Sequence, residues 1–78
     1  MVYACMLVRT KGGTFKEVLS EIEKLRETQR AYSALGRWDI VVLFRVSDLE
    51  QLASLVEKVN QLAPVRDSET LIEIVRES

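Results

Sequence analysis

Histidine is absent from the 78 residues, and cysteine and proline each occur once. Without histidine the chain lacks the commonest general base and metal ligand. The single cysteine, Cys5, excludes an internal disulfide and any Cys/His metal cluster. No serine has a recognisable base partner in the sequence. We therefore expect no enzyme activity, no metal and no cofactor, and we expect Cys5 to be a packing residue in a reducing compartment.

Long apolar runs and an excess of one charge are also missing. No segment approaches the ~20 apolar residues that a membrane helix needs, and residues 1–8 lack the features of a signal peptide. Eleven Lys and Arg face twelve Asp and Glu, which gives a net charge of −1. That balance argues against a standing affinity for nucleic acid or an anionic membrane. We expect a cytoplasmic protein that binds neither.

What is present indicates one folded domain over residues 1–78, with 47% hydrophobic and 29% charged residues. Residues 2–8 and 40–46 are strand-length segments that are apolar on both parities, which is typical of central strands. The segments 28–34 and 69–75 carry polar residues and are predicted as edge strands.

Two helix-start signals separate these strands. Thr14 and Glu17 match a capping box, which predicts a helix from about residue 14 to residue 26 or 27. Ser47 or Asp48 can cap a second helix, and Pro64 places its end near residue 62 or 63. The order is strand, helix, strand, strand, helix, strand.

This order predicts a ferredoxin-like α+β fold, with a four-stranded antiparallel sheet in the order 4-1-3-2 and two helices on one face. Alternation along the central strands assigns one set of side chains to the helix-free face. That set is Tyr3, Cys5, Leu7, Val41 and Leu43. Left bare, it would be a large apolar patch for a monomer, so we expect it to form a dimer interface.

The turn at residues 35–39 joins the second and third strands. Gly36 supplies a position where a positive φ has little steric cost. Asp39 follows the turn and has two interpretations. It can bond to nearby backbone amides, as Asp near a turn often does, or it can line a polar pocket at the edge of the sheet.

These elements together resemble the RAM domain (regulation of amino-acid metabolism), the ligand-binding domain of the Lrp/AsnC transcription regulators. The resemblance covers nearly the whole chain. It rests on the opening apolar strand, the glycines before the first helix, Tyr32 before Gly36-x-x-Asp39, Asp48-Leu49 opening the second helix, and Pro64-x-x-x-Ser68-x-Thr70. The family usually has Thr at the position of Ser68, Tyr or Phe at that of Trp38, and often a hydrophobic residue at that of Thr28. Because Met1 opens directly on the first strand, the chain is similar to a stand-alone form without the helix-turn-helix domain.

The resemblance implies dimers formed by sheet packing, ring-like oligomers of those dimers, and effector amino acids bound between dimers. It also suggests full-length Lrp/AsnC regulators as partners. The expected ligand-binding residues are Leu35, Gly36, Arg37, Trp38, Asp39, Ser68 and Thr70. Because the turn and the entry to the last strand belong to opposite sheet edges, they could share a small ligand only across subunits. From the residues alone, Ser68 and Thr70 also fit simple edge-strand polarity.

Two further families share this element order. Small enzymes of the dimeric α/β-barrel type also pair their sheets, but they usually need an acid/base group, often histidine. The ACT domain is another amino-acid sensor, and its glycine-containing ligand loop is hard to place at residues 10–14.

Overall fold

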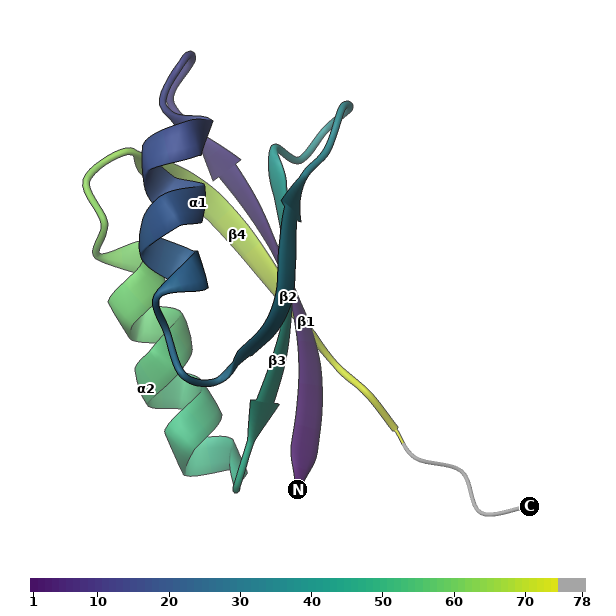
Figure 1. Cartoon of the computed structure of the whole chain (residues 1–78). Coiled ribbons are helices and arrows are strands. Elements are labelled where there is room, and N and C mark those ends of the chain that lie inside the picture. The colour runs from purple at the N-terminus through teal and green to yellow at the C-terminus, as the bar shows by residue number, and fades with distance from the viewer. Residues whose placement is uncertain (75–78) are drawn as a thin grey trace.

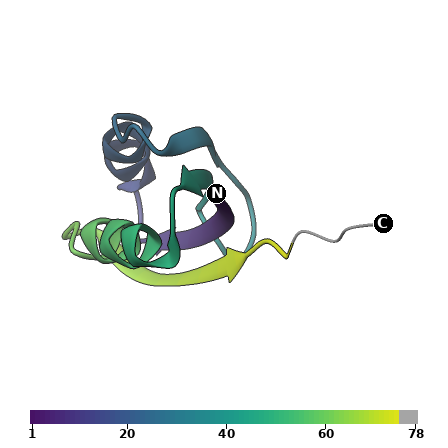
Figure 2. The ribbon, with the colours of Figure 1, turned by 90° about the horizontal axis from the view of Figure 1, so that it is seen from below.

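The computed structural model describes residues 1–74. Its elements follow the order β1 (Val2–Thr10), α1 (Phe15–Glu23), β2 (Thr28–Ser33), β3 (Ile40–Val46), α2 (Leu49–Asn60) and β4 (Val65–Ile72). The four strands form one antiparallel sheet in the order β2-β3-β1-β4. Both helices lie against the same face of the sheet (Figures 1 and 2). The predicted ferredoxin-like fold and strand order are confirmed.

The core lies between the helices and the sheet. Every second residue of β1 and β3 is buried there, and α1 and α2 contribute the residues that face them. The buried apolar residues are Ala4, Met6, Val8, Val18, Ile22, Ile40, Val42, Phe44, Val46, Leu52, Leu55 and Val59. The alternation in sequence thus assigned the two faces of the central strands correctly.

Helix α1 differs from its prediction at both ends. Thr14 is the N-cap residue, but its side chain makes no capping hydrogen bond. Its hydroxyl donates instead to the Lys11 carbonyl, within the turn that also holds Gly13 at a φ of 81°. The helix ends at Glu23, where the Lys24 and Leu25 amides turn back to the carbonyls of Glu21 and Ile22, and the Thr28 hydroxyl also donates to the Ile22 carbonyl at 2.8 Å. The capping box and the end at residue 26 or 27 were therefore wrong.

Helix α2 begins as predicted. Asp48 is the N-cap, and its side chain accepts from the Gln51 amide at 2.8 Å. The Gln51 side chain accepts in return from the amide and hydroxyl of Ser47, both at 2.7 Å. The helix ends at Asn60 rather than at 62 or 63, since the Leu62 amide turns back to the Val59 carbonyl at 3.1 Å.

Strand β4 starts at Val65, four residues before its predicted start at residue 69. The cause is β1, which is nine residues long and pairs with β4 up to Thr10 and Val65. The start of β4 is therefore set by backbone pairing with β1. The pattern of polar side chains in β4 does not mark it. Ser68 is therefore inside the strand, and residue 75, predicted as its end, lies outside the described residues.

Candidate functional site

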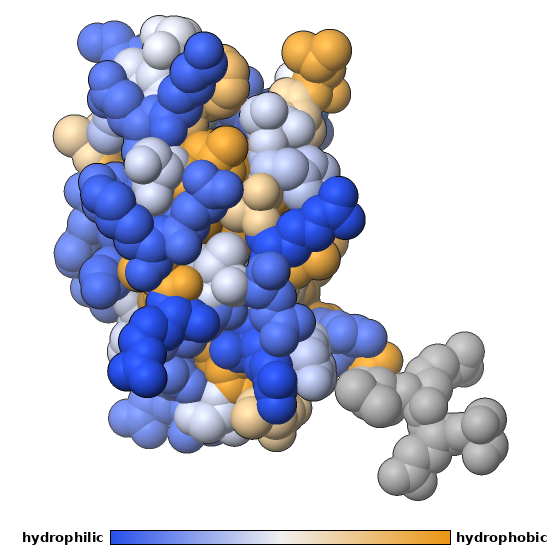
Figure 3. Space-filling model, in the orientation of Figure 1, coloured by the Kyte–Doolittle hydropathy of each residue, from blue (hydrophilic) through white to orange (hydrophobic). Residues whose placement is uncertain are grey.

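The β2–β3 hairpin projects beyond the body of the sheet (Figure 1). Gly36 has a φ of 130°, as its position in the turn predicted. Leu35 is fully exposed, and the hairpin tip forms an apolar knob on the surface (Figure 3). The Arg37 guanidinium lies over the Trp38 ring at 5.7 Å from its centroid, within cation–π range. The tip thus offers a free apolar side chain and a stacked cation.

Asp39 anchors the hairpin to the end of β1. Its Oδ2 accepts from the Thr10 amide at 2.7 Å and from the Thr10 hydroxyl at 3.3 Å. Its backbone amide donates to the Val8 carbonyl at 2.9 Å, and its carbonyl accepts from the Ala34 amide at 2.8 Å. The carboxylate therefore has a structural role, bonding to the neighbouring strand and not to amides of its own turn.

Asp39 also borders a small hollow of about 200 Å³ under the hairpin. Phe15 and Ala34 line its apolar side, and Ser33 and Leu35 complete it. Asp39 can therefore bond to backbone and also line a polar pocket. Its Oδ2 accepts from Thr10, while the residue borders the hollow. An ammonium group would have to bind at the other oxygen, Oδ1.

Ser68 and Thr70 lie on the helix side of β4, since they pair with the buried residues Val8 and Met6 of β1. The Ser68 hydroxyl donates to Oδ1 of Asn60, the last residue of α2, at 2.7 Å. Ser68 borders a polar hollow of about 290 Å³ with Asn60. Thr70 borders a wider apolar groove of about 610 Å³ between α2 and β4.

One subunit does not bring the two polar sets into one cavity. The hollow at Asp39 includes neither Ser68 nor Thr70, and theirs do not include Asp39. Asp39 and Ser68 flank the same residue of β1, Val8. Two strand spacings, about 10 Å, thus separate their backbones, and fully buried Val8 stands between them. The hairpin tip extends further away, beyond the sheet.

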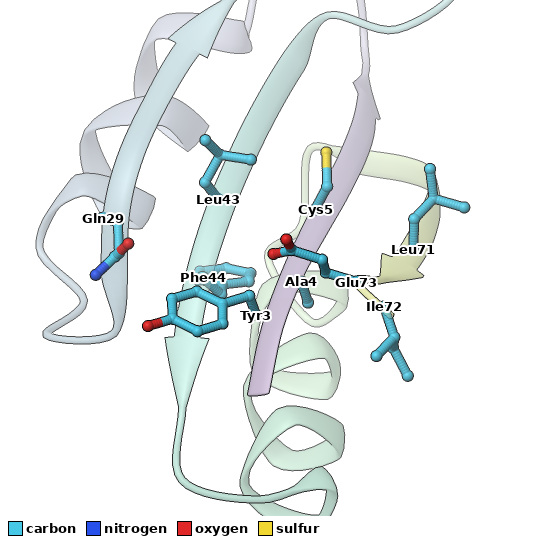
Figure 4. Close-up of a pocket in the computed structure, with 9 residues that line it drawn as sticks. All are labelled: Tyr3, Ala4, Cys5, Gln29, Leu43, Phe44, Leu71, Ile72 and Glu73. Atoms are coloured by element: carbon cyan, nitrogen blue, oxygen red, sulfur yellow. The ribbon is translucent and has the colours of Figure 1, made fainter. Parts of the chain in front are cut away.

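The helix-free face of the sheet carries the predicted interface residues. Tyr3, Cys5, Leu7 and Val41 are half-buried, and Leu43 is 39% exposed. A shallow hollow of about 440 Å³ lies over Tyr3, Cys5 and Leu43 (Figure 4). Burial raises the pKa of the Cys5 thiol, so the thiol stays protonated and apolar in this surface. Together these residues form a continuous apolar strip across β1 and β3.

The family model for the Lrp/AsnC ligand binding domain matches residues 3–76 of this sequence. The chain belongs to the Lrp/AsnC family. Its curated relatives include the HTH-type transcriptional regulator FL11 of Pyrococcus abyssi, 30% identical over 69 residues, and that of Pyrococcus furiosus, 30% identical over 71 residues. These matches cover 88% and 91% of this chain but 46% and 47% of the relatives, so the chain spans about half their length.

Solved structures share the fold of this chain. TTHA0845 from Thermus thermophilus is 29% identical, with a TM-score of 0.93 and coverage of 100% of this chain and 99% of that chain. PHS023 from Pyrococcus horikoshii is 27% identical, with a TM-score of 0.88 and coverage of 97% and 93%. The curated relatives are transcriptional regulators, and the Lrp/AsnC family is not an enzyme family. The dimeric α/β-barrel enzyme is therefore not the class to which this domain belongs.

The sequence pattern did not identify two residues that bond to the candidate site residues. Thr10 donates to Asp39 from 29 residues away, and Asn60 accepts from Ser68. Polarity was the available signal, since Thr10 ends an apolar strand and Asn60 follows the buried Val59. Within residues 1–74, no group of three or more His, Cys, Asp or Glu is arranged to hold a metal. No helix in that range has the length and apolar character to cross a membrane.

Proposed function

We propose that this Lrp/AsnC domain, as a single unit over residues 1–78, binds a free amino acid between subunits and couples that binding to oligomerisation. The observation that carries the proposal is the division of the polar groups between the hairpin and β4. Asp39, Ser68 and Thr70 each border a different open hollow, and none of the three hollows encloses a small ligand by itself. A site completed by a second subunit makes binding and assembly depend on each other.

The groups on the two sides suit a zwitterion. Asp39 can take an ammonium at Oδ1, and open backbone amides around Gly36 can take a carboxylate. Arg37 and Trp38, which stack on each other at the hairpin tip, would close over the side chain of the ligand. From another subunit, Ser68 and Thr70 would supply hydroxyls, with Asn60 fixing the orientation of the Ser68 hydroxyl at 2.7 Å.

The basic unit of the proposed assembly is a homodimer formed through the helix-free face. Tyr3, Cys5, Leu7, Val41 and Leu43 would lie in its centre. Exposed apolar patches of this kind mark interaction sites in soluble proteins. Contacts between hairpins and β4 edges of neighbouring dimers would then close a larger ring around the ligand sites.

The domain would act on transcription through other chains. A net charge of −1 gives no electrostatic basis for holding duplex DNA, so we propose co-assembly with DNA-binding Lrp/AsnC regulators. Duplex binding by this chain that weakens steeply with salt would overturn this part of the proposal.

The direct test is a thermal-shift screen of the chain against the twenty amino acids, followed by calorimetry on each hit. Ser68→Ala should weaken binding about tenfold or more, the loss expected for one hydrogen bond to a charged group. Arg37→Ala should also weaken binding, because it removes a side chain that would cover the ligand. Ser54→Ala, at an exposed position of α2, is the matched control and should leave affinity unchanged. Unchanged affinity in both site variants would place the ligand elsewhere.

A further inference from the structure

The hollow under the β2–β3 hairpin has mainly apolar walls, which come from two elements. Phe15, the first residue of α1, is half-buried and packs against the edge of the core. Ser33 ends β2 and pairs with buried Ile40, so it lies on the side of the sheet that α1 covers. Ala34 follows Ser33, and its amide donates to the Asp39 carbonyl at 2.8 Å. This bond holds the small Ala34 side chain beside the carboxylate residue, opposite Phe15.

The charge around this hollow comes from one residue. Among the five residues that line it, Asp39 alone is ionisable. Oδ2 of Asp39 accepts from Thr10, so Oδ1 is the oxygen that can take an ammonium group. The lining includes no cation that could neutralise a second carboxylate. Because a charge moved away from water without a partner is costly, the hollow is unsuited to a charged group of the ligand.

An amino acid bound at Asp39 would bring its side chain to this hollow. With the ammonium on Oδ1, the α-carbon lies one bond further on, at the mouth of the hollow. The carboxylate is taken by backbone amides around Gly36 in the site proposed above, which leaves the hollow to the side chain. Its volume is about 200 Å³, and an apolar cavity of about 150 Å³ already binds benzene. Aliphatic and phenyl side chains therefore fit.

We propose that this hollow selects amino acids with an uncharged, apolar side chain, from leucine to phenylalanine in size, and that Phe15 and Ala34 set the preference. The inference rests on the amino-acid binding proposed above and adds the class of ligand. Neither residue belongs to the turn at 35–39 or to the polar set on β4. Each would contact the ligand only through its side chain, so each would affect which amino acid binds.

The alternative is that the ligand side chain points across the subunit interface. It would then enter the polar hollow of the other subunit, which Asn60, Arg66 and Ser68 border. A guanidinium and an amide favour a side chain with a carboxylate or a carboxamide. The apolar hollow is preferred here because Asp39 itself borders it, directly beside the ammonium. The two arrangements predict opposite classes of ligand.

The experiment measures the affinity of the wild-type chain for a homologous series by calorimetry. The series is alanine, α-aminobutyrate, norvaline and norleucine, in which each member has one more methylene than the last. Burial of one methylene strengthens binding about fourfold, so norleucine should bind roughly 60-fold more tightly than alanine. Lysine, which is norleucine with a terminal ammonium, should lose most of this gain, and glutamate should bind no better than alanine.

A variant that fills the hollow links the preference to these residues. Ala34→Leu occupies the space beside Phe15, so it should weaken norleucine at least about tenfold more than it weakens alanine. Ala63→Leu is the matched control, at an exposed position between α2 and β4, and should leave the ratio of the two affinities unchanged. Phe15→Leu, which shortens the opposite wall, is an independent second variant and should lower the same ratio. Circular dichroism checks that each variant folds.

The outcomes separate the two proposals. If no amino acid binds wild type, the proposed function fails, and the ligand class fails with it. If amino acids bind but affinity does not rise along the series, or if Ala34→Leu leaves the ratio unchanged, amino-acid binding stands and the role of this hollow is overturned. A preference for glutamate or glutamine would likewise overturn it, in favour of the polar hollow of the other subunit.

Discussion

Replacing Asp39 with alanine should destabilise the domain more than any other loss of a single carboxylate from the sheet. The carboxylate accepts from the Thr10 amide at 2.7 Å and its hydroxyl at 3.3 Å. Thr10 is only 7% exposed, so water cannot easily replace the lost acceptor. A hydrogen bond to a charged group contributes about 1.5–3 kcal/mol, and an unsatisfied buried donor costs a similar amount.

We therefore expect Asp39→Ala to lower the free energy of unfolding by about 2–3 kcal/mol. For a domain of this size each kcal/mol shifts Tm by about 4–8 °C, so the shift should be roughly 10–20 °C. Thr10→Val, which removes the hydroxyl but keeps the amide, should cost about 1 kcal/mol. The assay is urea unfolding at one fixed protein concentration, because a dimer makes stability concentration-dependent.

Asp67→Ala is the matched control. It removes a carboxylate whose ion pair with Arg9 is 3.6 Å long and about half exposed on both sides. Exposed pairs of this kind contribute between 0 and ~1 kcal/mol. Equal destabilisation by Asp39→Ala and Asp67→Ala would refute the reasoning, because burial of the Thr10 amide would then have no energetic consequence.

Three further predictions concern the surfaces of the domain. Leu43→Asp should dissociate the proposed dimer, because it puts a charge into the apolar strip; light scattering that shows an unchanged dimer would contradict this. Gly36→Val should lower the free energy of unfolding by about 1–3 kcal/mol, because a φ of 130° strains any residue with a side chain. A Cβ at this position meets no atom within 4 Å, so backbone strain and not a clash is the cause. Equal urea midpoints for Gly36→Val and the control Gly12→Ala would contradict this. Cys5, whose pKa burial raises, should alkylate more slowly at about pH 8 in the folded chain than in urea, because the thiolate is the reactive form; equal rates by mass spectrometry would count against it.

The fold could be read from the sequence because its signals are local. Alternation in β1 and β3 identified the buried face, and Asp48 marked the start of α2. Element ends were less predictable because partners distant in sequence set them. Thr28, at the start of β2, bonds to the Ile22 carbonyl in the last turn of α1, and β4 begins where its pairing with β1 begins.

In the candidate site, too, local features could be predicted from the sequence and contacts between distant residues could not. The positive φ of Gly36 follows from the residue type and its place in a turn. The structural role of Asp39 depends on Thr10, 29 residues earlier, and the orientation of Ser68 depends on Asn60. No spacing rule links such pairs before the strands are in register. The sequence predicted that the turn and the start of the last strand belong to opposite sheet edges, whereas Asp39 lies beside the central strand β1.

The measurement that tests the central claim most directly is sedimentation velocity of wild type and Leu43→Asp, each titrated with the twenty amino acids. The account predicts that at least one amino acid binds wild type and shifts it to a larger assembly. The dissociated variant should bind that amino acid at least about tenfold more weakly, because the site is completed by a second subunit. Equal affinity in a monomeric Leu43→Asp would contradict the account, as would the absence of any binding amino acid.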